Sequence, residues 1–393
     1  MARRRLPNFA WEYIEGGAED ESTLTRNCSA FADHLWVHRV GVNVEKRTLE
    51  TNLLGGSFKL PFAIGPTGFN GMLWKHGDIE LAKAAKDAGI PFITSTVASD
   101  SVRDIAKHVD GRLWFQLFIL KDPKGNDALI HRAEEAGCDT MFVTLDAPTI
   151  GNRTWNNRNY SKPMQLSLRS KLNVLAHPRW FMNVYFPGGL PGFGNLAEFL
   201  PPDKRSPLDG ARVFGSQDYP ELTWADVERV RERWRGKLVL KGLLAREDVA
   251  RAVKLGADGV VLSNHGGRQL DYEISALDVL PAIAAEFRDK LTIMIDGGFR
   301  RGSDIAKALA LGADMVLLGR ATLYGLAAGG QAGAARALEI LRSELDLVLM
   351  LLGCPHIADL SPQFLHTKDS SAGTGRAHRS DELVLGRARA ATG

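Results

Sequence analysis

Eight short apolar runs, separated by longer amphipathic segments, constrain the fold of this chain more than any other feature of its sequence. Strands that are apolar throughout and alternate with helices are typical of a parallel sheet covered by helices. Eight such units favour an α/β fold of the (β/α)8 TIM-barrel type, and an open doubly wound sheet is the alternative. Several predicted helices end at a glycine just before the next strand, as helices commonly do. The predicted strands are 61–64, 91–94, 113–117, 140–144, 237–240, 258–262, 291–295 and 314–318, and the predicted helices are 77–88, 101–109, 124–136, 223–235, 245–255, 275–287 and 302–311.

The composition is that of a globular protein with a sizeable core, since 45% of the 393 residues are hydrophobic and 24% are charged. A net charge of +3 is too balanced to indicate a nucleic-acid partner. Cys28, Cys138 and Cys354 lie far apart, so we predict neither a disulfide framework nor a metal site, and we expect a reducing, cytoplasmic compartment. The sequence shows no secretory signal and no run of 18 apolar residues, so no spanning helix is predicted.

Three regions fall outside the repeating pattern. Residues 1–60 precede the first strand, and we expect them to pack as helices over one end of the barrel. Residues 147–222 separate the fourth strand from its helix, and an insertion of this length is expected to be functional or mobile. Residues 367–393 are rich in Ser, Gly, Ala and Arg, which predicts a flexible tail. The sequence therefore predicts a single barrel domain over residues 1–366.

Residues 263–271, just after the sixth predicted strand, carry the most chemistry in the chain. His265 is the type of side chain best suited to moving protons near neutral pH. Arg268 offers a planar fork that matches a carboxylate or a phosphate. Because the site of such a barrel lies at the carboxyl ends of its strands, the pair indicates a site for a small organic acid. A structural histidine beside a surface arginine is the alternative.

The last two strands and the fifth strand add further candidates. Glycines with Arg300 and Arg320 supply backbone N–H groups and cations where barrels commonly hold a phosphate, although tight turns with solvated arginines are the alternative. Lys241 projects from the fifth strand into the barrel, where an unpaired charge is costly. We therefore expect it to face an anion or an electron-rich ring, and a Schiff-base lysine is the other option.

The order of the motifs resembles that of the FMN-dependent 2-hydroxy acid oxidases and dehydrogenases over about residues 6–366. The pattern is most similar to the mandelate dehydrogenase and quinone-linked L-lactate dehydrogenase branches of that family. The motifs that carry the resemblance are Tyr13 with residues 16–20, Pro66-Thr67-Gly68, Trp114-Phe115-Gln116-Leu117, Thr144-Leu145-Asp146, Lys241-Gly242, residues 263–271, residues 296–302 and Leu318-Gly319-Arg320.

The resemblance implies a role for each matching residue. His265 is implied as the catalytic base, Asp146 as its partner, and Lys241 as a cation near the flavin ring. Arg153, Arg268 and Tyr13 match groups that bind the substrate carboxylate. The implied FMN-binding residues are Pro66, Thr67, Gly68, Ser95, Gln116, Thr144, Lys241, Ser263, Asp296, Gly298, Arg300, Gly319 and Arg320.

Three positions depart from relatives and bear on the substrate and the electron acceptor. Phe118 stands where many relatives have a tyrosine, and Val97 stands where glycolate oxidase has a tryptophan. Both changes predict an apolar, wider pocket for an aryl or longer alkyl 2-hydroxy acid. Gly68 is an alanine in glycolate oxidase and resembles the mandelate dehydrogenase pattern, which favours a dehydrogenase over an oxidase. L-lactate dehydrogenase, or an oxidase that uses oxygen, is the alternative.

The insertion resembles the corresponding segment of the membrane-associated dehydrogenases. Basic residues beside Trp180, Phe181 and Phe186 suit a bilayer interface, which we place within residues 165–215; a lid on the barrel or a subunit contact is the alternative. The hypothesis is a peripheral contact with the inner membrane face that lets a quinone reoxidise the flavin. The resemblance also implies a homotetramer. From other classes, a flavin-free lyase or isomerase using Lys241 and a ligand-binding barrel stay open.

Overall fold

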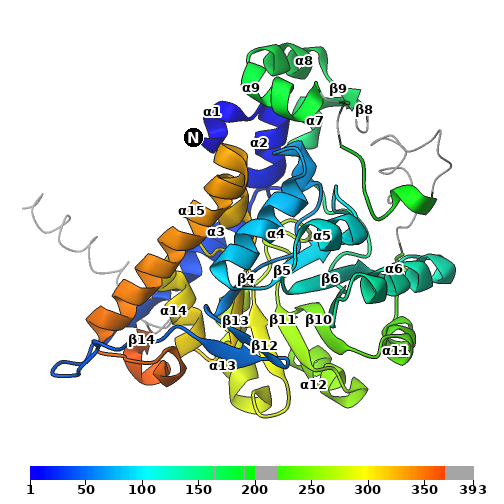
Figure 1. The fold of residues 1–393 in the computed structure, drawn as a ribbon. Coiled ribbons are helices and arrows are strands. Elements are labelled where there is room, and N and C mark those ends of the chain that lie inside the picture. The colour runs from blue at the N-terminus through cyan, green and yellow to red at the C-terminus, as the bar shows by residue number, and fades with distance from the viewer. Residues whose placement is uncertain (163–164, 187, 190, 200–218, 368–393) are drawn as a thin grey trace, which may run out of the picture.

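The computed structural model describes residues 1–162, 165–186, 188–189, 191–199 and 219–367 (Figure 1). Eight parallel strands in this part of the chain form a closed barrel in which the last strand pairs with the first. The predicted (β/α)8 barrel is therefore confirmed. Its strands are β4 (Phe62–Ile64), β5 (Phe92–Ser95), β6 (Leu113–Phe118), β7 (Thr140–Thr144), β10 (Lys237–Leu243), β11 (Gly259–Leu262), β12 (Thr292–Ile295) and β13 (Met315–Leu318).

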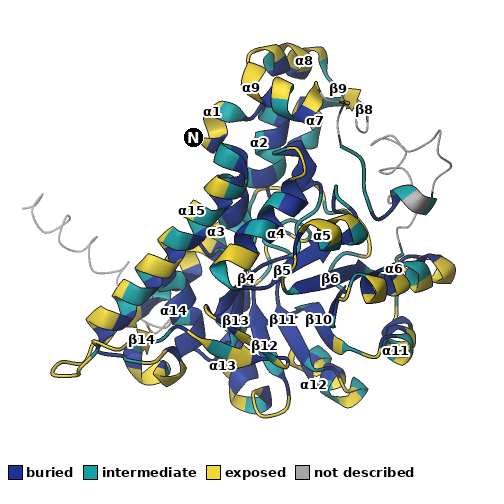
Figure 2. Ribbon diagram, viewed as in Figure 1, coloured by how far each residue is buried: buried dark blue, intermediate teal, exposed yellow. Residues whose placement is uncertain are grey.

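A helix follows each barrel strand and covers the outside of the barrel, so the buried strands lie inside a partly exposed ring (Figure 2). Helix α4 ends at Gly89 and α12 ends at Gly256, both in the left-handed conformation that glycine adopts without strain. The last helix has a kink at Gly329 and Gly330. The outer helices are α4 (Gly77–Ala88), α5 (Val102–His108), α6 (Pro123–Glu135), α11 (Trp224–Arg233), α12 (Arg246–Leu255), α13 (Ala276–Phe287), α14 (Gly302–Ala310) and α15 (Arg320–Leu352).

A β-hairpin closes the amino-terminal end of the barrel. Strands β2 (Thr51–Leu53) and β3 (Gly56–Phe58) are joined by Leu54 and Gly55, which both have positive φ, as a tight hairpin turn requires. Phe58 packs edge-on against Trp114, at 5.6 Å between ring centroids, and shares a buried cluster with the interior strand residues. The expectation that residues 1–60 are helical is thus wrong for this hairpin, because its turn favours paired strands.

The first part of that segment is helical and lies at the opposite, carboxyl end of the strands. Its backbone reaches the loop after β11, since the Ala18 N–H donates to the carbonyl oxygen of Gly267. After these helices, β1 (His34–Trp36) pairs with β14 (Leu365–Thr367). The helices are α1 (Ala2–Arg5), α2 (Asn8–Glu15), α3 (Ser22–Ser29) and the 3-10 turn η1 (Ala30–Asp33), while η2 (Asn70–Met72), η6 (Ile357–Asp359) and η7 (Pro362–Phe364) are short turns elsewhere.

The insertion after β7 forms a small helical layer beside α1 and α2 (Figure 1). Buried Trp180 anchors it by donating its indole N–H to the carbonyl oxygen of Met72, at 2.8 Å. Residues 200–218 of the insertion and 368–393 of the predicted tail lie outside the described residues. No helix in the described ranges is long and apolar enough to cross a membrane. The elements of the insertion are α7 (Asn156–Asn159), β8 (Tyr160–Lys162), β9 (Gln165–Leu166), α8 (Leu168–Leu175), α9 (Pro178–Trp180), the π-helical turn η3 (Phe181–Tyr185) and η4 (Ala197–Phe199).

Candidate active site

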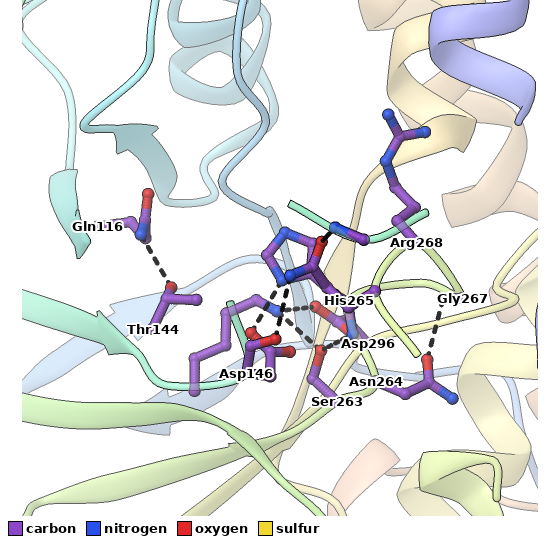
Figure 3. A network of polar contacts seen from close by, with 12 residues as sticks. Gln116, Thr144, Asp146, Ser263, Asn264, His265, Gly267, Arg268 and Asp296 are labelled. Atoms are coloured by element: carbon purple, nitrogen blue, oxygen red, sulfur yellow. Dashed lines mark hydrogen bonds and ion pairs between the residues drawn. The ribbon is translucent and has the colours of Figure 1, made fainter. Parts of the chain in front are cut away.

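An imidazole and a carboxylate from two different strand ends meet at the mouth of the barrel (Figure 3). His265 follows β11 and Asp146 follows β7, and His265 Nδ1 lies 2.9 Å from Asp146 Oδ1. Since an ionised carboxylate only accepts, Nδ1 carries the proton, which leaves Nε2 as the basic atom of the ring. Burial alone would raise the pKa of the Asp146 carboxyl, but the nearby His265 and Lys241 outweigh it and lower that pKa.

The backbone around this pair explains why glycines surround it. His265 has φ of 55°, and Gly266 and Gly267 continue the left-handed stretch. A side chain at Gly267 would lie 2.6 Å from the backbone of Leu24 in α3. Gly242 has φ of 98°, and a Cβ there would lie 2.5 Å from Asp146 Cγ. These glycines therefore let the histidine turn back over the barrel and let the Asp146 carboxylate sit beside β10.

Lys241 is buried inside the barrel and is fully engaged there. Its Nζ donates to Ser263 Oγ at 2.7 Å and pairs with Asp296 at 2.9 Å. Burial lowers the pKa of Lys241, but Asp296 and Asp146 outweigh burial, so the pKa lies above its usual value. A Schiff-base lysine needs a neutral amine, so this environment disfavours the covalent role weighed from the sequence.

A chain of polar side chains crosses the mouth between β5, β6 and β7. Ser95 donates its hydroxyl to Gln116 Oε1 at 2.7 Å, and Gln116 Nε2 donates to Thr144 Oγ1 at 2.8 Å. All three residues are buried, and Thr94 beside them keeps a buried hydroxyl oxygen without a hydrogen-bond partner in the structure. The strand ends thus present an oriented polar wall.

Arginine side chains gather on the other side of the mouth, where α2 ends. Arg268 donates to the carbonyl oxygens of Tyr13 and Gly16, and Arg320 donates to those of Ile14 and Gly16. These carbonyls at the carboxyl end of a helix carry partial negative charge, which suits a cation. Arg153 extends from the insertion to within 3.5 Å of the Arg268 carbonyl oxygen.

The arginine cluster lacks carboxylate partners. No ion pair of Arg153, Arg268, Arg300 or Arg320 occurs among the residues that the structure describes. Burial and the neighbouring Arg153 and Arg320 hold the pKa of Arg268 well below its usual value, and burial with Arg300 lowers that of Arg320. Burial also lowers the pKa of Arg153. Crowded, desolvated cations of this kind form a site for an external anion.

Residues of β6 and of the loops after β4 and β5 line the same mouth. Tyr13 donates its hydroxyl to the carbonyl oxygen of Gly68 at 2.9 Å, and its ring lies under Arg268. The Phe118 ring stacks on the His265 imidazole, with 6.2 Å between centroids. A Cβ at Gly68 would lie 2.6 Å from Val97 Cγ2, so the glycine and the valine are in direct contact.

The structure brings the predicted site residues to one end of the barrel, but not all in the expected manner. Arg300 lies over the Tyr324 ring and donates to its neighbour Phe299, and Thr67 donates its hydroxyl to Asn70. Pro66, Gly298 and Gly319 contribute backbone at the ends of β4, β12 and β13. The predicted roles of these residues toward a cofactor stay predictions.

The residues of α3 and of the loop after β11 that hold the site in place were not predicted from the sequence. Asn27 in α3 and Asn264 exchange two amide hydrogen bonds of 2.8 and 2.9 Å. Asp271 accepts from the backbone N–H groups of Asp20, Ser22 and Thr23 and so holds the start of α3. The two glycines after His265 indicated a close backbone approach in this turn, but nothing in the sequence indicated that α3 would be the partner.

Comparison with known proteins places this geometry in a family. The model of the FMN-dependent dehydrogenase family matches residues 2–367. The chain belongs to the FMN-dependent dehydrogenase family. It is 42% identical to (S)-mandelate dehydrogenase of Pseudomonas putida over 94% of this chain and 92% of that protein. It is 41% identical to an L-lactate dehydrogenase of Xanthomonas campestris pv. campestris over 92% and 93% of the two chains.

A solved structure agrees with these relatives. The crystal structure of the monotopic membrane protein (S)-mandelate dehydrogenase superposes with a TM-score of 0.89 at 41% identity, and covers 93% of this chain and 96% of that chain. The protein is accordingly an FMN-dependent oxidoreductase acting on 2-hydroxy acids, and the flavin-free alternatives are not supported.

The residues at the mouth fit FMN. Asp296 keeps one buried carboxylate oxygen, Oδ1, without a partner in the structure, which suits a hydroxyl donor such as those of a ribityl chain. Arg300 and Arg320 have no ion pair in the described chain, which suits a phosphate at the start of α15. Lys241 supplies a buried cation that pairs with Asp296.

Proposed function

We propose that this enzyme oxidises an (S)-2-hydroxy acid with a large apolar substituent, such as mandelate, to the 2-oxo acid. Phe118 and Val97 support this preference, since they present a ring without a hydroxyl and a small side chain at the mouth. The 42% identity to a mandelate dehydrogenase points the same way. The observation that carries the proposal is the His265–Asp146 pair, placed beside a cluster of uncompensated arginines.

His265 acts as the base in this proposal. The free Nε2 atom accepts a proton from the substrate, while the Nδ1–H group stays on Asp146. The resulting imidazolium is stabilised by the Asp146 carboxylate. His265 and Lys241 lower the pKa of that carboxyl by more than burial raises it. Asp146 thus fixes the ring orientation and favours the charged ring.

In this proposal Arg153 and Arg268 bind the substrate carboxylate, and Tyr13 joins them when its hydroxyl leaves the carbonyl oxygen of Gly68. Arg268 keeps N–H donors beyond those that it gives to Tyr13 and Gly16, because a guanidinium has five. A carboxylate that binds here relieves the repulsion between Arg153 and Arg268. The clamp fixes which face of the substrate is presented for oxidation.

FMN, when bound, takes up the two electrons that leave the substrate. We assign its binding to the strand-end residues predicted from the sequence, with Ser95, Gln116, Thr144 and Ser263 as polar contacts. Lys241, held by Asp296, would supply positive charge to the bound flavin. Pro66, Thr67, Gly68 and Gly298 contribute backbone, and Arg300, Gly319 and Arg320 bind the phosphate.

A quinone is the proposed electron acceptor, with oxygen as the alternative. Gly68 supports a dehydrogenase because it matches the mandelate dehydrogenase pattern, and the chain packs Val97 directly against it. A homotetramer and a single domain over residues 1–366 remain part of the proposal.

The surface of the insertion supports a peripheral membrane contact. Leu168, Leu172 and Leu175 of α8 are exposed by 60–74%, and Phe186 by 67%. Arg169, Lys171 and Arg179 are exposed on the same layer. Apolar side chains flanked by cations are typical of proteins that lie on an anionic bilayer. We place this contact on the inner face of the cell membrane.

Anaerobic reduction of the purified yellow protein tests the function. Mandelate is expected to bleach the flavin faster than lactate, glycolate or longer alkyl 2-hydroxy acids, and a quinone is expected to restore the colour faster than oxygen does. Fastest bleaching by lactate would overturn the mandelate preference, and faster reoxidation by oxygen would overturn the dehydrogenase assignment. Absence of co-sedimentation with anionic vesicles at low salt would overturn the membrane contact.

A further inference from the structure

A groove outside the barrel mouth lies between the amino-terminal helix and the insertion. It is wide open to solvent and is lined by Arg5, Pro178, Arg179, Met182 and Asn183. Arg5 is the last residue of α1, and the other four residues belong to α9 and η3. The groove therefore joins two segments that are far apart in the sequence.

The two arginines of the groove crowd one another without a counter-ion. Arg5 lies on the Trp74 ring, 3.9 Å from its centroid, and its buried Nε–H group has no hydrogen-bond partner in the structure. Burial and the nearby Arg179 lower the pKa of Arg5. No carboxylate forms an ion pair with either arginine in the described part of the chain. A bound anion would reduce the repulsion between the two guanidinium groups.

The walls of the groove are held in place, so the site does not depend on a mobile loop. Trp180 is buried and donates to the carbonyl oxygen of Met72, and its ring packs edge-on against Phe9. Asn183 accepts from the Lys75 backbone N–H through its side-chain oxygen, at 3.3 Å, which leaves its amide N–H donors for a ligand. The backbone that carries Arg179 is therefore held in place before any anion binds.

Exposed apolar side chains in the groove and elsewhere on the same layer decide what kind of anion fits. Met182 in its lining is 57% exposed, and the exposed leucines of α8 belong to the same layer. A free inorganic anion gains nothing from such a rim, whereas a lipid buries its acyl chains along it. Cations beside these apolar side chains also attract the anionic headgroups of a membrane.

We propose that the groove binds the phosphate of an anionic phospholipid, with Arg5 and Arg179 as its ligands. The proposal rests on the proposed membrane contact. That contact needs only exposed apolar area and diffuse positive charge, whereas the proposal adds a defined site for a lipid headgroup. It predicts that the two groove arginines contribute more to membrane affinity than other arginines of the same layer.

Vesicle binding of the flavin-loaded enzyme tests the site with a matched control. The test variant is Arg179→Gln and the control is Arg169→Gln, which removes one exposed charge from α8 at a position outside the groove. On vesicles of phosphatidylcholine with phosphatidylglycerol, Arg179→Gln should lose about tenfold in affinity. Diffuse attraction instead predicts the same loss in both variants, about fivefold or about 1 kcal/mol. Arg5→Gln should resemble Arg179→Gln. Equal losses at positions 179 and 169 would overturn the proposal.

A soluble lipid separates this proposal from the membrane contact itself. Dihexanoyl phosphatidylglycerol below its micelle concentration should bind the wild type, bind Arg179→Gln at least tenfold more weakly, and bind more tightly than inorganic phosphate. If the wild type ignores vesicles yet binds this lipid through Arg179, the membrane contact fails and the groove site stands. If inorganic phosphate binds as tightly as the lipid, or neither binds, the lipid site is overturned. Thermal unfolding and flavin content confirm that each variant is folded.

Discussion

Two groups of cations at the barrel mouth have opposite arrangements. Lys241 is neutralised from within the fold, by Asp296 at 2.9 Å and by the nearby Asp146, and its pKa is raised. Arg153 and Arg268 find only carbonyl oxygens and each other, and their pKa values are lowered by burial. The fold thus supplies a counter-ion for Lys241, whereas a ligand must supply the counter-ion for Arg153 and Arg268.

Lys241 therefore belongs to the part of the site that is complete in the folded protein, whereas Arg153 and Arg268 belong to the part that recognises a ligand. Removal of one partner from a compensated buried pair leaves an unpaired charge and destabilises the protein, whereas an uncompensated cluster costs free energy until an anion binds. His265 is likewise held from within the fold, because its Nδ1–H group donates to Asp146. The comparison predicts that variants of the first group lose chemistry or stability and that variants of the second group lose affinity.

The largest effect is expected from His265→Ala. Removal of the base should slow flavin reduction by about 10²–10⁴-fold, since general-base catalysis contributes that much. The variant should keep its flavin, because the strand-end residues assigned to FMN are unchanged. Stopped-flow reduction under anaerobic conditions measures the rate, and an unchanged single-turnover rate would contradict the assigned role.

Lys241→Met tests the compensated cation. It leaves Asp296 buried without its partner, and breaking a buried pair of this kind costs about 3 kcal/mol of unfolding free energy. Urea unfolding followed by circular dichroism measures the loss. Lys241→Arg, which keeps the charge, is the control and should lose less; equal stability of the wild type and Lys241→Met would show that the pair is not stabilising.

Arg268→Ala tests the uncompensated cluster. Affinity for the 2-oxo acid product should fall about 10–100-fold, since a hydrogen bond to a charged group contributes about 1.5–3 kcal/mol. Unfolding free energy should change far less than in Lys241→Met, because repulsion from Arg153 and Arg320 is relieved. Titration of the flavin absorbance measures affinity. Arg268→Lys should be intermediate, and full affinity in Arg268→Ala would refute the clamp.

Gly242→Ala tests whether the backbone holds Asp146 in place. The new Cβ would lie 2.5 Å from Asp146 Cγ at a φ of 98°, so both contact and backbone strain oppose it. Such a φ costs a non-glycine residue about 1–2 kcal/mol, and displacement of Asp146 should slow flavin reduction about tenfold. Gly256→Ala, with φ of 76° and open space around it, is the control for strain alone. Equal reduction rates in the two variants would exclude a positioning effect.

The smallest effect concerns Asp78, a buried carboxylate without a cation. Burial and the nearby Asp100 raise its pKa to about 7, although Asn70, Ser99 and Asp100 donate hydrogen bonds to it. A carboxyl whose pKa is higher in the folded state loses stabilisation as pH rises, here from about pH 4 to about pH 7.

The unfolding temperature should therefore fall by a few degrees more between pH 5 and pH 8 in the wild type than in Asp78→Asn. Differential scanning calorimetry of both proteins measures the difference. Parallel pH profiles would show that Asp78 does not titrate in this range.

Much of the fold was predictable because the barrel is a local repeat. Each strand and each of the seven predicted outer helices can be predicted from its own residues alone. Helix α4 even has the predicted bounds. The hairpin at residues 51–58 was missed because its turn is Leu54-Gly55, which lacks the Asn or Asp common in such turns. The site residues were predictable as a set because the carboxyl ends of all eight strands face the same side.

The sequence by itself determined the barrel, the family and the list of polar side chains at its mouth. Only the tertiary structure decided which charges are paired: Lys241 with Asp296, His265 with Asp146, and the arginines with the carbonyl oxygens at the end of α2. The reason is that periodicity is a property of neighbouring residues, whereas the electrostatic environment of a side chain depends on residues that are distant in the chain. Asp146 and His265 are 119 residues apart and meet only because the barrel closes.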